Sequence, residues 1–177
     1  MKSKIIPTLV NTSANAEMLS TVPHRQMLDL SVVYRIIEED ESGFSAALVT
    51  EDLLRELKLD FEELEAIGLE NFSRQYGAET FELTDTLKVM TNRLRLFGAT
   101  GILYGELLKE TSDSFGRDFY IVPVSVHEMM LVPEGAMSTE ALKEILKEGN
   151  RNIASAEEFL SENIYRYSEG KLETVTV

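Results

Sequence analysis

The chain has no cysteine, and its 177 residues include only four prolines and ten glycines. The absence of cysteine excludes a disulfide framework, a thiolate zinc site, an iron–sulfur cluster and a cysteine nucleophile. The few prolines and glycines form no low-complexity linker and no internal repeat. We therefore expect a single domain over residues 1–177, with no bound metal and no cofactor.

Long apolar runs are missing as well. None approaches the roughly 20 residues that cross a bilayer, and Pro7, Asn11 and Asn15 interrupt the N-terminal stretch where a signal peptide would need its apolar core. With 44% hydrophobic and 27% charged residues, the composition is that of an ordinary globular protein. We expect a cytoplasmic protein that makes no contact with membranes.

Positive charge is scarce, because 17 Lys and Arg residues face 31 Asp and Glu residues, which gives a formal net charge of −14. Such a field repels nucleic-acid phosphates, so we expect no direct binding to nucleic acid. It keeps the protein soluble, and it also permits a cationic partner or mimicry of DNA toward a DNA-binding protein. The expected partner is a protein, and the oligomeric state stays open.

The first half of the chain contains the clearest strand pattern. Residues 27–37 alternate between apolar and polar side chains, which predicts a strand with one buried face. The predicted buried face consists of Leu28, Leu30, Val32, Tyr34 and Ile36, and the opposite face of Asp29, Ser31 and Arg35. The acidic run at 38–41 is expected to form an exposed loop leading to a second strand at 44–49, which together make a hairpin.

Helix signals flank this hairpin. A brief helix is expected at 14–19, with its N-cap among residues 11–13. Thr50 is the expected N-cap of one later helix. Asp60 and Glu63 form a capping box for the next helix, which ends near residue 77.

In the second half, residues 78–87 are expected to be irregular and residues 88–93 to form a short strand. A helix is expected over 98–111. Its first four residues, Gly98-Ala99-Thr100-Gly101, are small and would permit a close approach to another element. They match neither of the glycine-rich patterns typical of phosphate-binding loops, so a phosphate site is the weaker interpretation.

The last third predicts a hairpin from residues 118–123 and 126–132, then a helix that starts at Ser138. Ser155 and Glu158 form another capping box for a short helix. Residues 164–167 and 172–177 form a final hairpin or an extended arm. Hairpins separated by helices predict an α+β fold, with a mainly antiparallel sheet and helices packed on it.

Several blocks together resemble an uncharacterised bacterial family, domain of unknown function 5688. The most specific blocks are VPHRQMLDLSVVYR at 22–35 and NIYRY at 163–167, and DFYIVPVSVHE at 118–128 is a third. The resemblance covers nearly the whole chain. Members of that family are generally longer, which implies that this chain is a C-terminal portion or a naturally short form. No activity follows from the resemblance.

The two histidines are the main candidates for chemistry. His24 has Asp29 a few residues on, and His127 lies between Ser125 and Glu128 at the expected start of a strand. Because histidine titrates near neutral pH, such pairs suit acid–base catalysis, with Ser125 as a conceivable nucleophile. The alternative is that each histidine satisfies backbone groups near a proline-marked turn.

Other residues suit ligand binding. Asn92, Arg93 and Arg95 form a compact basic cluster that would receive an anion or pair with glutamates, and Arg25 follows His24. Tyr165 and Tyr167 would stack on a ligand or cover a core.

Three functions follow in order of preference. The first is a non-enzymatic protein-binding or regulatory module, because no cofactor loop, metal spacing or nucleophile elbow is present. The second is a small hydrolase or transferase that uses His24 and His127. The third is an acidic DNA mimic.

Overall fold

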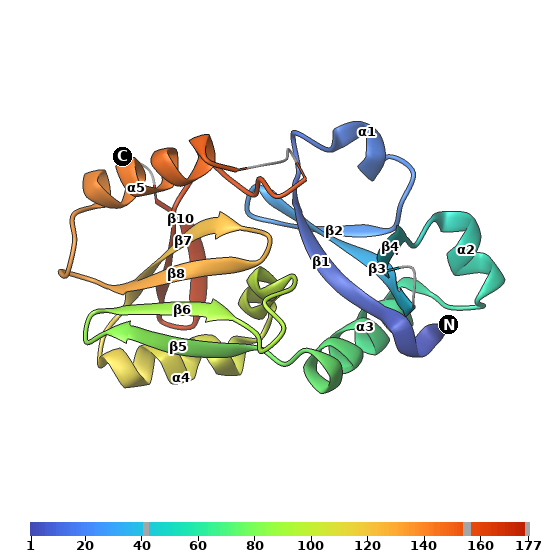
Figure 1. Ribbon diagram of the computed structural model, residues 1–177, viewed down its shortest axis with the longest axis horizontal. Helices are drawn as coiled ribbons and strands as arrows, with labels where there is room; N and C mark the ends of the chain where they lie inside the picture. Colours follow the sequence, from blue (N-terminus) through green and yellow to red (C-terminus); the bar gives the residue numbers. More distant parts are fainter. Residues whose placement is uncertain (41–42, 154–156, 176–177) are drawn as a thin grey trace. The chain divides into compact units, whose positions relative to one another are not determined.

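The computed structural model describes residues 1–40, 43–153 and 157–175 (Figure 1). Contacts among these residues divide the chain into two compact units, Met1–Gly77 and Ala78–Val177. Each unit has helices and its own antiparallel sheet, which confirms the predicted α+β class. The described strands form two separate sheets, one in each unit. The single domain over 1–177 stays a prediction, because a division of contacts does not show whether the units fold separately.

In the first unit, β3 is the central strand of the sheet. β1 pairs antiparallel along one edge of β3, and β2 and β4 pair with successive stretches of its other edge. The elements in chain order are a 3-10 turn η1 (Lys2–Lys4), β1 (Ile5–Asn11), α1 (Ala16–Leu19), β2 (His24–Met27), β3 (Leu30–Asp40), β4 (Gly43–Leu48), α2 (Glu51–Glu56) and α3 (Phe61–Gln75).

The strand expected over 27–37 is wrong at its start. β2 ends at Met27, and β3 begins opposite it at Leu30, so Leu28 and Asp29 form a two-residue hairpin turn. Leu28 has a left-handed φ of 58°. Such turns usually carry Gly, Asn or Asp at left-handed positions, so a leucine there conceals the turn from a reading of the sequence.

The predicted polar face of this strand is also wrong, because β3 is buried on both sides. Ser31 is 0% exposed, and its hydroxyl lies 2.9 Å from Thr12 Oγ1. On the opposite face Tyr34 lies under α3, where the ideal Cβ position of Gly68 is 3.1 Å from the ring. On the Ser31 face, Val33 packs against residues of α1 and the segment after it. Burial on both faces explains why β3 is rich in apolar residues.

The acidic run lies partly in a strand. Glu38 and the next two residues extend β3 instead of forming a loop, and Glu41 lies outside the described residues. Lys4 Nζ lies 3.2 Å from Glu38 Oε1, so this exposed strand end pairs its charge across the sheet. The predicted hairpin between β3 and β4 is confirmed.

The starts of α2 and α3 agree with the cap signals, and the start of α1 does not. Thr50 Oγ1 accepts a hydrogen bond from the Leu53 amide at 3.2 Å and starts α2. Asp60 and Glu63 form the complete capping box at the start of α3. At α1, Asn11 Oδ1 accepts from the Ala14 amide at 2.9 Å, although the N-cap residue itself is four positions later.

The second unit is built on a sheet in the strand order β10-β9-β7-β8-β6-β5, all neighbours antiparallel. Its elements are β5 (Glu79–Thr84), β6 (Leu87–Thr91), η2 (Gly98–Leu103, a 3-10 helix), α4 (Gly105–Phe115), β7 (Phe119–Ser125), β8 (Glu128–Pro133), α5 (Thr139–Arg151), β9 (Tyr165–Ser168) and β10 (Lys171–Thr174). The hairpins β7–β8 and β9–β10 are confirmed, as is the helix capped by Ser138.

Two expectations in this unit are wrong, and a third concerns a residue outside the described ranges. Residues 78–87 are not irregular, because they contain β5 and its turn to β6. The helix expected over 98–111 is divided at Tyr104 into η2 and α4. Ser155 lies outside the described residues, and residues 157–163 contain no helix.

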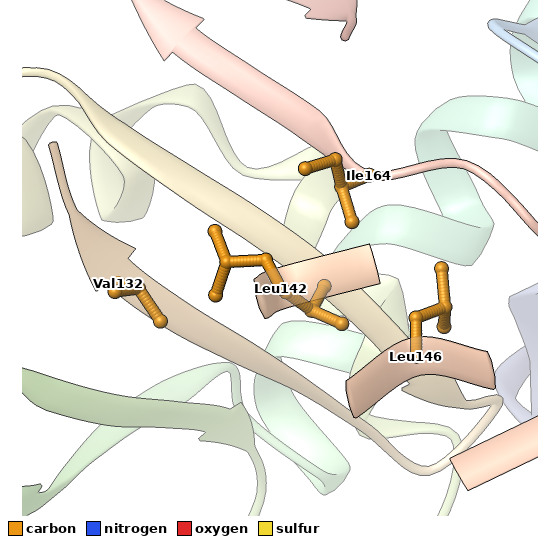
Figure 2. Close-up of a cluster of buried hydrophobic side chains, with 5 residues drawn as sticks. Val132, Leu142, Leu146 and Ile164 are labelled. Carbon is orange, nitrogen blue, oxygen red and sulfur yellow. The ribbon is translucent and has the colours of Figure 1, made fainter. Parts of the chain in front are cut away.

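Helices cover both faces of this second sheet. α5 packs Leu142 and Leu146 against Val132 of β8 and Ile164, all almost fully buried (Figure 2). On the other face, the Phe115 ring of α4 lies 5.8 Å from the Phe119 ring. Figure 1 shows α4 and α5 on opposite sides of the sheet. The β5 edge keeps large apolar side chains exposed on the α5 side, and the candidate site lies there.

Candidate functional site

A groove with an apolar half and a polar half lies along β5 and β6 in the second unit. It has a volume of about 440 Å³. Its lining residues are Phe81, Leu83, Val89, Thr91, Asn92, Arg93, Arg95 and Glu128. Phe81 is 42% exposed and Leu83 61% exposed. Phe81 pairs with Val89, which pairs with Met130, and Met130 packs against the cluster under α5. The groove is therefore the part of this sheet face that α5 leaves open.

One wall of the groove is a short loop, residues 92–97, which we call the arginine loop. The Asn92 side chain fixes it: Nδ2 donates to the Leu96 carbonyl at 2.6 Å, and Oδ1 accepts from the Leu94 and Leu96 amides at 3.0 and 3.2 Å. Asn92 is 1% exposed. Arg95 and Phe97 hold left-handed φ values of 53° and 54°, which such side-chain bonds help to maintain.

His127 supports the same loop from the turn between β7 and β8. Its Nδ1 accepts a hydrogen bond from the Phe97 amide at 3.2 Å, so this nitrogen carries no proton while the bond is made. The Ser125 hydroxyl accepts from the His127 amide at 3.1 Å, and Thr91 Oγ1 donates to the His127 carbonyl at 2.8 Å. His127 therefore lies in the turn and positions the loop; β8 begins one residue later.

Gly98 lets the loop return close to the sheet. An added Cβ would lie 2.5 Å from both Cα and Oγ1 of Thr91 and would also strike the His127 carbonyl. Real Cβ atoms essentially never come that close, so only glycine fits without movement. This confirms the prediction that the small residues at 98–101 permit a close approach.

The two arginines at the rim of the groove differ in their ion pairs. Arg93 Nε lies 2.9 Å from Glu79 Oε1, although its side chain is 81% exposed. The Arg95 guanidinium makes no ion pair with any residue that the structure describes. Glu128 lines the groove as an exposed carboxylate. Among the described residues, Arg95 is thus a cation without an ion pair beside exposed apolar side chains.

The candidates in the first unit form a separate group. His24 Nδ1 donates to the Val22 carbonyl at 3.0 Å, and the exposed histidine lines a cleft of about 480 Å³. Arg25 Nε lies 2.7 Å from Glu65 Oε1, and the Tyr34 hydroxyl is 3.5 Å from the same oxygen. Burial, and then the charge of Glu65, raise the pKa of the Tyr34 phenol well above its ordinary value.

The structure thus joins some of the predicted site residues and leaves others in another unit. Asn92 and Arg93 meet the Ser125–Glu128 segment around the arginine loop. His24, Arg25 and Asp29 belong to the first unit, and Asp29 lies in the turn between β2 and β3, where its carbonyl accepts from the Thr12 amide. The shared site of His24 and His127 stays a prediction.

The sequence matches a known protein family along most of its length. Residues 1–90 and residues 80–169 both match the model of DUF5688, a family of unknown function. The chain belongs to the DUF5688 family. No curated protein and no solved structure gives a significant match. The matches give no support to the expectation that the chain is a C-terminal portion of a family member.

The tyrosines of the NIYRY block in this DUF5688 chain are buried. Tyr165 is 0% exposed and Tyr167 6% exposed, which favours the core interpretation over ligand stacking. Between them, Arg166 lies 2.8 Å from Asp118 and 3.2 Å from Glu134. The hydrogen bond to Glu134 is the main reason that the pKa of Arg166 is raised. This block ties β9 to β7.

Neither a metal-binding cluster nor a membrane-spanning helix is found among the described residues. No group of three or more His, Asp and Glu side chains within them is placed to hold a metal ion. None of the described helices is long and apolar enough to cross a membrane.

Sequence reasoning missed the apolar half of the groove. Phe81 and Leu83 lie on β5, in the segment expected to be irregular. A signal was available, because Thr80, Glu82 and Thr84 alternate with these two residues just before a polar turn.

Proposed function

We propose that this DUF5688 chain is a non-enzymatic protein-binding module whose docking surface is the groove between β5 and the arginine loop. The observation that carries the proposal is a pair of large, exposed apolar side chains, Phe81 and Leu83, beside Arg95, an arginine that has no ion pair in the described part of the chain. Exposed apolar patches with a polar rim mark interaction sites in proteins. Arginine and aromatic residues are also enriched at the centres of interfaces.

The hydrogen bonds around the groove support binding rather than catalysis. His127 Nδ1 and the Asn92 amide already serve backbone groups of the loop, so neither is free at these atoms for a substrate. The same bonds hold the loop in one conformation before any partner arrives. A rigid loop loses less entropy on association, which favours affinity.

The test is capture of partners from a native lysate by the full chain and by matched variants. Leu83→Asp places a charge in the groove, and Phe44→Ser is the control, because Phe44 is 46% exposed on β4 of the first unit. We expect Leu83→Asp to lose specific partners that wild type and Phe44→Ser retain. Circular dichroism verifies that each variant is folded. Partners that are unaffected by Leu83→Asp, or lost equally with Phe44→Ser, would contradict the proposal.

A further inference from the structure

β5 is an open edge of the second sheet. Within the described residues it pairs with β6 alone, and the strand order ends there. Every second residue of an edge strand directs its N–H and C=O groups away from the sheet, where another strand can pair with them. Residues 81–84 of this strand are exposed. The register irregularity between Glu82 and Thr84 leaves the stretch from Glu79 to Glu82 as the regular part.

The apolar side chains of the groove project beside this edge. Phe81 and Leu83 are two residues apart and both line the groove, so they lie on one face of the strand. A strand added next to β5 would place its own alternate side chains directly beside them. Strand addition with pockets for alternate side chains is a recurring mode of peptide recognition.

The charged side chains of the groove indicate which charged residue such a peptide carries. The Arg95 guanidinium has no ion pair within the described residues and lines the same groove, whereas Arg93 is paired with Glu79, and Glu128 adds one exposed carboxylate to the lining. A carboxylate matches a guanidinium through two parallel hydrogen bonds. The chain as a whole carries −14, but charges are screened beyond about 8 Å at physiological ionic strength. Once a peptide is in contact with the groove, the nearby charge of Arg95 therefore determines which charged side chain is favoured. The overall negative field mainly slows the encounter.

We propose that the groove binds an extended segment of a partner protein that adds as a strand to β5, inserts alternate apolar side chains beside Phe81 and Leu83, and gives an Asp or Glu carboxylate to Arg95. This inference rests on the proposed function and names the chemistry of its partner. A second copy of the chain fits less well. Two chains that each carry −14 repel one another, and β5 contains no basic residue that could receive a carboxylate of a second β5; its Glu79 and Glu82 are already ion-paired with Arg93 and Lys88.

The test begins with a displayed library of random nonapeptides selected on the intact protein. We expect the selected peptides to alternate β-branched or aromatic residues with polar ones and to contain Asp or Glu. Fluorescence polarisation of the best synthetic peptide then gives its Kd. Arg95→Glu should weaken binding about tenfold or more, because a charge-assisted hydrogen bond is lost and a repulsion is added. Arg151→Glu, an exposed arginine in the last turn of α5, is the control and should bind as wild type does.

Two modified peptides make the test specific. Exchanging the acidic residue for Lys should abolish binding to wild type and restore binding to Arg95→Glu. N-methylation of alternate backbone nitrogens should abolish binding if the peptide adds as a strand, since those N–H groups pair with β5. No selected peptides, selected peptides without acidic residues, helical periodicity, or binding insensitive to Arg95→Glu would each overturn the inference.

The outcomes separate this inference from the proposed function. If lysate partners depend on Leu83 while acidic extended peptides do not bind, the module stands and its partner chemistry is wrong. If lysate partners ignore Leu83→Asp, the proposed function itself fails. Self-association that depends on β5, seen as a concentration-dependent mass in light scattering, would assign the groove to a second copy and overturn the inference.

Discussion

Substitution of Gly98 by alanine tests how the arginine loop is held against the sheet. The added Cβ would lie 2.5 Å from two atoms of Thr91 and against the carbonyl of His127, whereas ordinary contacts begin at about 3.4 Å. The obstructing groups are main-chain atoms and a hydroxyl that is hydrogen-bonded to that carbonyl. They cannot rotate aside, and the Ala99 amide also donates to the Val126 carbonyl at 3.3 Å, which ties η2 to the same turn.

The expected magnitude follows from these neighbours. Overpacking costs typically about 1–3 kcal/mol, and more where backbone must move. A better helix propensity returns at most about 1 kcal/mol. We expect Gly98→Ala to lower the free energy of unfolding by about 2–3 kcal/mol. Gly101→Ala should cost less, because the nearest atoms to its added Cβ belong to side chains and not to the backbone: Met90 at 2.8 Å and Leu107 Cδ2 at 3.5 Å. Gly105→Ala meets nothing within 4 Å and should be neutral or stabilising.

Urea titration followed by far-ultraviolet circular dichroism measures these three variants against wild type. Hydrogen exchange with mass spectrometry locates the loss, and we expect faster exchange in peptides from residues 78–177. If Gly98→Ala is as stable as Gly105→Ala, the close approach of η2 to the sheet is wrong. The positioning of the arginine loop would then be wrong with it.

Three further predictions concern the first unit and metal content. Leu30→Ala should lower the free energy of unfolding by about 2–5 kcal/mol, because the side chain is fully buried. Ser31→Ala should lower it by about 1 kcal/mol, because the hydrogen bond to Thr12 is lost. Equal losses for the two variants in a denaturant titration would contradict this. Burial raises the pKa of Tyr34 above its ordinary 10.0, so the folded chain keeps this proton above pH 10 while the unfolded chain loses it, and stability falls as pH rises from there. Tyr34→Phe should show a smaller decline in stability over that range, and an identical decline would show that Tyr34 does not cause it. Elemental analysis of untagged protein should find no stoichiometric transition metal, and about one zinc or iron per chain would refute this.

The elements predicted correctly are those whose signals are local. Asp60 and Glu63 mark the start of α3 through contacts within one turn, and two apolar runs separated by a short polar interruption predict the β7–β8 hairpin. The errors arise where a local signal is absent or overridden. Leu28 occupies a left-handed turn position without the usual residue type, and Ser31 is buried because a second layer covers its face.

The candidate site depends on pairing between distant segments. Asn92, Arg93, His127 and Glu128 could be nominated from the sequence, because polar residues of these types stand out in it. Their meeting depends on the pairing of β6 with β8, about 40 positions apart along the chain, which no periodicity specifies. The sequence did favour backbone hydrogen bonding as the alternative role for His127, and its Nδ1 accepts from the Phe97 amide, but the pattern could not identify that partner.

Site-specific photo-cross-linking tests the docking groove most directly. Benzoylphenylalanine in place of Phe81 puts the reactive group in the groove, and the same residue in place of Phe44 puts it on an exposed strand of the first unit. The account predicts a discrete adduct with a partner protein from position 81, none from position 44, and loss of the adduct when Arg95→Glu is added. An adduct that forms equally from both positions, or none from position 81, would contradict the groove as the docking surface.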